Sequence, residues 1–132
     1  MKLFDHTVIV PPGLVRRKDT AQLNKKERTM ELYVEAGAYA RLLSDVGAEA
    51  AVAMSKILPA KDADRLVYLL NKIDEIKCKV DDQLFSDFPQ IGHDGTSVFY
   101  GTLSQETQGE LDEKVIRTAR QKAEELFGSN VD

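Results

Sequence analysis

Tryptophan is absent from this chain of 132 residues, and cysteine occurs once, as Cys78. A single cysteine excludes a disulfide within the chain, which is typical of a reducing compartment, and we therefore expect a cytoplasmic protein. The chain holds no run of eighteen apolar residues, so we predict no transmembrane helix and no membrane partner. The first ten residues, MKLFDHTVIV, lack the continuous apolar core of a secretion signal.

Aromatic residues make up only 7% of the sequence, whereas hydrophobic residues reach 42% and charged residues 30%. This balance is typical of a globular chain and excludes disorder throughout. The core must then consist mainly of leucine, isoleucine, valine and alanine. At this length one domain is expected, so we treat residues 1–132 as a single domain.

Proline is also scarce, and its absence from most of the middle of the chain predicts long helices. Only Pro59 interrupts residues 23–88, in which apolar side chains recur at helical spacing. We expect a first helix from about Asn24, which has capping-box spacing with Glu27, to the residues before the proline. Gly47 leaves open whether this helix is continuous, because glycine disfavours a helix interior by about 1 kcal/mol relative to alanine.

Two further helices are predicted after this proline. The second spans residues 60–85, where leucine, isoleucine and valine keep the helical period. The third begins at Ser104 or Thr107 and runs to Gly128, which is placed as its C-terminal cap. Since short connections favour antiparallel neighbours, we predict an antiparallel bundle of long helices.

A small β element is expected beside the bundle. Residues 7–10 are all β-branched, and residues 97–100 form a short run of serine, valine and aromatic residues between glycines. Pairing would give each isolated strand a partner. The predicted fold class is therefore mainly α, with a small two-stranded β element formed by residues 7–10 with 97–100. Residues 1–22 would form an extended basic N-terminal segment, and residues 86–103 an irregular loop with a short strand.

Positive charge is concentrated at the start of the chain, although the net charge of the whole is −4. Residues 1–28 carry seven lysines or arginines against three acids, and the remaining residues carry eleven against nineteen. Such a patch can steer binding toward an acidic protein, or it can contact the phosphates of a nucleic acid. The cluster lacks aromatic side chains for base stacking, so we favour the protein partner. The candidate binding residues are Arg16, Arg17, Lys18, Lys25, Lys26 and Arg28.

Four acidic residues fall near one line of the first helix if that helix is continuous. Carboxylates one turn apart can hold a divalent metal when a second helix supplies further ligands. Such a centre would resemble that of helical metal-dependent nucleotide pyrophosphohydrolases, but their characteristic carboxylate pairs three residues apart are absent. The solvent side of an amphipathic helix explains the same pattern, so we predict no metal. The candidates considered are Glu31, Glu35, Asp45 and Glu49.

The sequence shows no arrangement typical of a catalytic centre. It lacks phosphate-binding glycine motifs and glycine-flanked serine elbows. His93 lies beside an aspartate in a glycine-rich stretch, which is typical of a turn. We therefore predict neither catalytic residues nor a cofactor.

The first helix carries more apolar surface than a single layer of three helices needs. Its apolar residues cover more than half of its circumference, which is typical of a helix packed between partners. We expect residues 30–46 to form a subunit interface, and a homodimer to result. The favoured function is that of a non-enzymatic interaction protein, an adaptor, regulator or inhibitor that binds another macromolecule. The alternatives are a nucleic-acid-binding regulator using residues 16–28 and a metal-dependent helical hydrolase.

Overall fold

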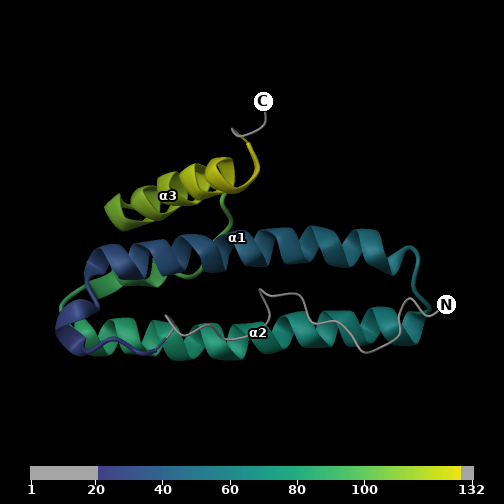
Figure 1. Cartoon of the computed structure of the whole chain (residues 1–132), viewed down its shortest axis with the longest axis horizontal. Helices are drawn as coiled ribbons and strands as arrows, with labels where there is room; N and C mark the ends of the chain where they lie inside the picture. The colour runs from purple at the N-terminus through teal and green to yellow at the C-terminus, as the bar shows by residue number, and fades with distance from the viewer. Residues whose placement is uncertain (1–20, 129–132) are drawn as a thin grey trace.

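Three long helices make up most of the fold. The computed structural model describes residues 21–128, in which α1 spans Met30–Ser55, α2 spans Ala60–Asp87 and α3 spans Glu110–Phe127. Two 3-10 helices accompany them: η4 (Lys25–Glu27) precedes α1, and η5 (Gly92–Ser97) follows α2. α1 and α2 run antiparallel as a hairpin, and α3 lies along the first half of α1, on the side away from α2 (Figure 1). The predicted mainly helical fold is confirmed.

The predicted β element is wrong, since no strand occurs in residues 21–128. Residues 97–100 instead contain the end of η5 and the turn that follows it, and Val98 has helical backbone angles (φ −67°, ψ −45°). Val98 and Phe99 are both buried in the core. The run of apolar residues that suggested a strand therefore reflects burial. The expected partner strand, residues 7–10, lies outside the described part of the chain.

The first long helix begins later than the sequence pattern suggested. The capping box of Asn24 and Glu27 does form, with the Glu27 amide donating to Asn24 Oδ1 at 3.1 Å, but it caps η4. α1 begins only at Met30, where Thr29 Oγ1 accepts a hydrogen bond from the Leu32 amide at 3.2 Å. A single turn of 3-10 helix therefore precedes α1.

The hairpin results from an uninterrupted α1 and a short connection. Gly47 does not break α1, which continues to Ser55. Pro59 then occupies the N-cap of α2, where the missing amide of proline removes no helical hydrogen bond. Because only residues 56–59 separate the two helices, α2 returns antiparallel along α1.

The last helix also begins later than predicted. Its N-cap is Gly109, which has no side chain to cap the helix, so the expected start at Ser104 or Thr107 is wrong. The side chain of Asp112 instead accepts a hydrogen bond from the Gln108 amide at 2.7 Å, just before the helix. Acidic residues in the first turn, including Glu110, interact favourably with the positive end of the helix dipole.

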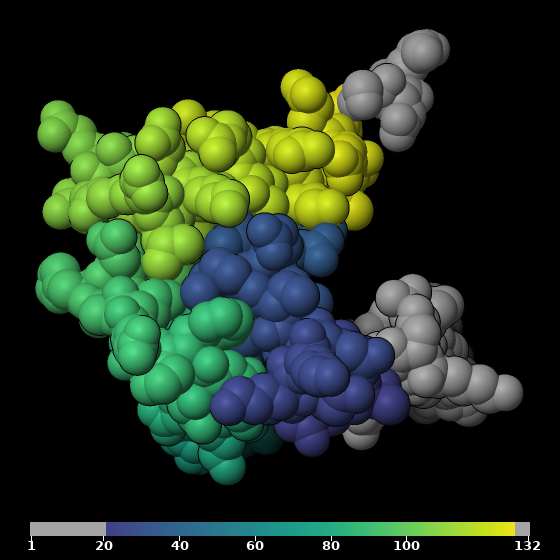
Figure 2. Space-filling view, turned by 90° about the vertical axis from the view of Figure 1, so that its left-hand side faces the viewer, coloured from purple at the N-terminus to yellow at the C-terminus, as the bar shows by residue number. Residues whose placement is uncertain are grey.

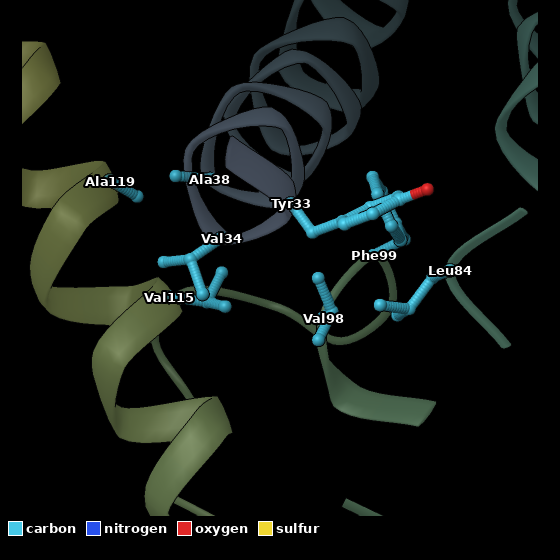
Figure 3. Packing of buried hydrophobic residues seen from close by; sticks show 8 residues of the cluster. All are labelled: Tyr33, Val34, Ala38, Leu84, Val98, Phe99, Val115 and Ala119. Carbon is cyan, nitrogen blue, oxygen red and sulfur yellow. The ribbon is translucent and has the colours of Figure 1, made fainter. Parts of the chain in front are cut away.

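The core occupies one end of the hairpin. Eight buried side chains pack there, contributed by the first half of α1, the end of α2, the segment after η5, and α3 (Figure 3); they are Tyr33, Val34, Ala38, Leu84, Val98, Phe99, Val115 and Ala119. Figure 2 looks onto this end, where yellow-green α3, the blue start of α1 and the green segment between α2 and α3 close against one another. The other half of the hairpin extends beyond this core (Figure 1).

Gly37 determines how closely the segment after η5 approaches α1. A Cβ at this position would collide with the carbonyl oxygen of Val98 and would lie 2.7 Å from its Cγ1. Backbone cannot move aside as a flexible side chain can, so only glycine fits. Gly47 differs, since a Cβ there would meet only the terminal Cδ2 of Leu70, at 3.3 Å.

We expect Gly37→Ala to lower the free energy of unfolding by about 1–3 kcal/mol, as overpacking of a closed core does. The matched control, Gly47→Ala, should be neutral or stabilising by up to about 1 kcal/mol, because alanine favours helix and Leu70 can adjust. Urea unfolding followed by circular dichroism measures both values. Equal effects of the two substitutions would contradict the close packing of Val98 on Gly37.

Candidate interaction surface

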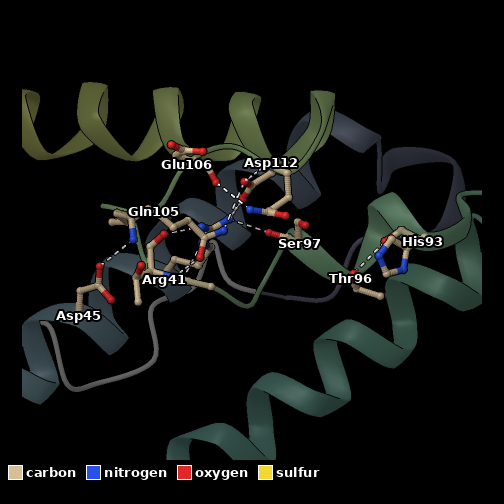
Figure 4. A network of polar contacts seen from close by, with 12 residues as sticks. Arg41, Asp45, His93, Thr96, Ser97, Gln105, Glu106 and Asp112 are labelled. Carbon is tan, nitrogen blue, oxygen red and sulfur yellow. Dashed lines mark hydrogen bonds and ion pairs between the residues drawn. The ribbon is translucent and has the colours of Figure 1, made fainter.

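Arg41 anchors three parts of the chain to one another. Its side chain is fully buried on the side of α1 that faces α3. Nη1 donates to Asp112 Oδ1 and to the Ser97 carbonyl, each at 2.7 Å. Nε and Nη2 donate to the carbonyls of Gly101 and Thr102, at 3.0 and 2.8 Å (Figure 4). The guanidinium therefore ties α1 both to α3 and to the segment that precedes α3.

Asp112 completes this buried ion pair. Its Oδ2 accepts hydrogen bonds from the Gln108 amide at 2.7 Å and from the Gln105 side chain at 3.3 Å. Burial alone would raise the pKa of Asp112, but the hydrogen bonds from Arg41 and Gln108 outweigh burial and hold that pKa below its usual value. Both carboxylate oxygens thus have partners, and a structural role accounts for all of these bonds.

A second ion pair joins the start of α1 to the end of α2. Arg28 donates from Nε to Asp87 Oδ2 at 2.7 Å and from Nη2 to Oδ1 at 3.0 Å. Tyr33 donates its hydroxyl to the same carboxylate. The hydrogen bonds from Arg28, and then the one from the Tyr33 hydroxyl, hold the pKa of Asp87 well below its usual range. Burial, together with the neighbouring carboxylate, raises the pKa of Tyr33 to about 12.

The predicted basic site divides between described and undescribed residues. The three candidates at positions 16–18 lie outside residues 21–128. Lys25 and Lys26 are exposed on η4. Arg28 is held by Asp87 and by the carbonyl of Leu23, so its charge is directed into the fold. Among the described candidates, Lys25 and Lys26 therefore present their charge to solvent.

The four acidic candidates do not converge on one point. Glu35 forms an ion pair with a lysine of α3 at 3.1 Å, and Asp45 accepts a hydrogen bond at 3.0 Å from the backbone just before α3. Glu31 and Glu49 are exposed. Between residues 21 and 128, no three side chains of histidine, cysteine, aspartate or glutamate come together as metal ligands could.

Beyond the core, the hairpin carries a groove between its two helices that no other part of residues 21–128 fills. The segment after η5 covers this face as far as Tyr100, whose ring lies 4.9 Å from the Lys77 ammonium and whose hydroxyl lies 3.1 Å from Cys78 Sγ. The next turns of the helices leave a hollow of about 200 Å³, which we call the end groove. Its walls include Gly47, Ala48 and Ala51 of α1 and Val67, Leu70 and Asn71 of α2.

A second apolar surface, which shares Leu43 and Ile73 with the end groove, runs along the whole hairpin, and we call it the hairpin face. It contains side chains of α1 that are 36% to 59% exposed and side chains of α2 that are 38% to 61% exposed. Ala36, Ile76 and Val80 line shallow hollows between the two rows. The large exposed side chains of this face are Leu32, Tyr39, Leu43 and Val46 of α1, and Leu69, Ile73 and Ile76 of α2.

No protein-family model, curated protein or solved structure matches this chain. No helix among residues 21–128 combines the length and the apolar character needed to cross a membrane. The fold and its surfaces define a mainly helical protein whose hairpin presents two apolar surfaces. Any role must therefore be inferred from these surfaces themselves.

Sequence reasoning did not identify Arg41 or Asp112, although one signal was available. Arg41 stands between Ala38 and Leu42 in the most apolar part of α1, and a charged side chain in such surroundings implies a buried partner. Its partner could not be read from the sequence, because Asp112 follows 71 residues later.

Asp112→Ala should lower the free energy of unfolding by about 3–5 kcal/mol, because the buried Arg41 guanidinium would lose its carboxylate. The double replacement of Arg41→Met with Asp112→Leu should recover only part of this loss, because it removes the unpaired charge but leaves three backbone carbonyls without their donor. As a surface control, Glu113→Ala removes a carboxylate 3.9 Å from Arg117 and should change stability by less than about 1 kcal/mol. Urea titration measures all three, and a loss for Asp112→Ala no larger than the control value would contradict the assigned role.

The lowered pKa of Asp87 predicts that the folded chain loses stability in acid. The pKa of this carboxylate is lower in the folded chain than in the unfolded chain, so its contribution is complete above about pH 4 and is lost as the pH falls further. Asp87→Asn should therefore be less stable than the natural chain at neutral pH, and its stability should fall less below about pH 4. Unfolding titrations at several pH values measure the difference, and parallel pH profiles for the two chains would argue against the ion pair.

Proposed function

We propose that this chain is a non-enzymatic helical interaction protein of the cytoplasm, which binds another protein through the end groove of its hairpin. The observation that carries the proposal is this apolar hollow, which lies on a pair of helices that extends beyond the core. Contiguous apolar surface on a monomer marks sites of association, since burial of that surface is favourable. An adaptor, a regulator or an inhibitor would each use such a site.

The covered half of the same hairpin indicates what the end groove can accept. There the segment after η5 places Val98 and Phe99 between the helices and α3. Past Tyr100 the two helices continue, but the chain turns toward α3. A partner segment with apolar side chains on one side would continue this packing along the hairpin.

The walls of the end groove suit close approach by such a segment. The α1 side of the groove is lined by the small residues Gly47, Ala48 and Ala51, so a partner can approach the α1 backbone closely. The hairpin connection adds further apolar area nearby, because Ile57 is 84% exposed. Polar groups stand at the edge, where Asp74 pairs with Lys77 at 3.3 Å.

The contacts of the two ion pairs favour binding over catalysis, because the fold itself uses these side chains. The bonds of Arg41 and Asp112 hold α1 to α3, and those of Arg28 and Asp87 hold the start of α1 to the end of α2. None of these four side chains lines the end groove. Their chemistry is thus accounted for by the fold.

An acidic partner would bind a different part of the molecule, the basic residues that precede α1. Lys25 and Lys26 precede α1, whereas the end groove begins roughly 20 Å further along that helix. We propose that an acidic protein contacts these lysines and residues 16–18. A nucleic acid remains the alternative for the same contact, and a steep loss of binding with rising salt would identify it.

Site-directed photo-crosslinking in the source cells tests the end groove. A photoreactive phenylalanine analogue in place of Val67 should yield a discrete adduct with another protein. The same analogue in place of Arg117, on the exposed side of α3, should yield none. Adding Ala51→Glu should reduce the Val67 adduct at least about tenfold, because a carboxylate would enter the apolar hollow.

Circular dichroism of each variant shows whether the helices are retained. Adducts of equal yield from positions 67 and 117 would contradict a specific site, as would the absence of an adduct at position 67. An adduct that survives Ala51→Glu unchanged would place the partner elsewhere.

A further inference from the structure

The apolar residues of the hairpin face follow a seven-residue repeat on both helices. Alternating intervals of four and three residues keep an apolar seam on one side of a helix, as in coiled coils and four-helix bundles. On α1 the seam passes through Leu32, Ala36, Tyr39, Leu43, Val46 and Ala50, and the same spacing reaches Ile57. On α2 it passes through Leu66, Leu69, Ile73, Ile76 and Val80.

These seams are exposed where a bundle would bury them. Val46 is 59% exposed and Ile76 is 61% exposed, although both hold central positions of the repeat. Seven large apolar side chains of the two seams are 36% to 61% exposed. A standard specific interface buries about 800 Å² per partner, and these side chains would form the centre of one.

Charged residues of opposite sign flank the two seams. On α1, Glu35 and Glu49 occupy the outer position next to the seam, fourteen residues apart. On α2, the corresponding outer positions hold Arg65, Lys72 and Lys79, each seven residues apart. Glu35 already pairs with a lysine of α3, and Lys72 pairs with Glu75, each at 3.1 Å. The hairpin face thus has an acidic edge along α1, exposed at Glu49, and a basic edge along α2.

We propose that the hairpin face binds a second copy of this chain, so that two hairpins form an antiparallel four-helix bundle. The two-fold axis runs along the bundle, and α1 of each copy lies against α2 of the other. The acidic edge of one copy then faces the basic edge of its partner. If α1 packed against α1 of the other copy instead, the basic edges of the two α2 helices would face each other. Repulsion between like charges disfavours that arrangement.

The contacts within one hairpin set the register of this pairing. Gly47 of α1 lies about level with Leu70 of α2, because a Cβ on Gly47 would lie 3.3 Å from Leu70 Cδ2. A two-fold axis along the bundle leaves these levels unchanged. Glu49 of one copy therefore comes between the levels of Arg65 and Lys72 of the other, within about one helical turn of each.

The oligomeric state of the full chain tests the proposal, with two valines as a matched pair. Val46 lies on the seam, whereas Val52 lies off it on the same helix and is similarly exposed, at 57%. The natural chain should sediment as a dimer at micromolar concentration. Val46→Glu should raise the dimer dissociation constant at least about a hundredfold, because burial would strip water from an unpaired carboxylate. Val52→Glu should change it less than about threefold.

A charge exchange tests which helix meets which. Glu49→Lys and Lys72→Glu should each weaken the dimer about two- to fivefold, and the two together should restore it. Circular dichroism confirms that each variant keeps its helices. A natural chain that stays monomeric at high micromolar concentration would overturn the proposal, whatever else covers the face. Equal effects of Val46→Glu and Val52→Glu would also overturn it, and a charge exchange without restoration would overturn the pairing of α1 with α2.

Discussion

The buried guanidinium of Arg41 imposes a demand that much of the covered end of the molecule satisfies. A cation removed from water needs a counter-charge and acceptors for its N–H groups, and Asp112 with three backbone carbonyls supplies them. Meeting this demand fixes the segment after η5 against α1. Val98 then lies on Gly37, and Phe99 enters the core. The position of α3 follows as well, because Asp112 belongs to its first turn.

Within the described part of the chain, the same arrangement leaves part of the hairpin without cover. The segment after η5 turns toward α3 near Tyr100, so the later turns of α1 and the early turns of α2 receive no packing from it. The core uses only one side of the first half of α1, although the apolar residues of this helix continue to its end. The end groove and the hairpin face are both consequences of helices longer than their core.

Several elements could be predicted from the sequence because their causes are local. Helical periodicity predicted all three helices, and Pro59 located the turn between α1 and α2. The capping box at Asn24 was also confirmed, yet it caps a separate 3-10 turn. The β element was wrong because β-branched and aromatic residues are favoured in strands and in buried turns alike. Only the contacts of Val98 with α1 decide between these two, and those contacts depend on residues far away in the chain.

The candidate sites show the same division. Charge counts indicated a basic start to the chain, but they could not show that Arg28 is held by Asp87, 59 residues later. The excess of apolar residues on the first helix was evident, whereas the end groove depends on where the segment after η5 stops covering the hairpin. The amino-acid sequence by itself determined the helices and their apolar seams, because periodicity and capping act within a few residues. Only the tertiary structure decided which of these apolar surfaces became core, since burial depends on residues that meet across the fold.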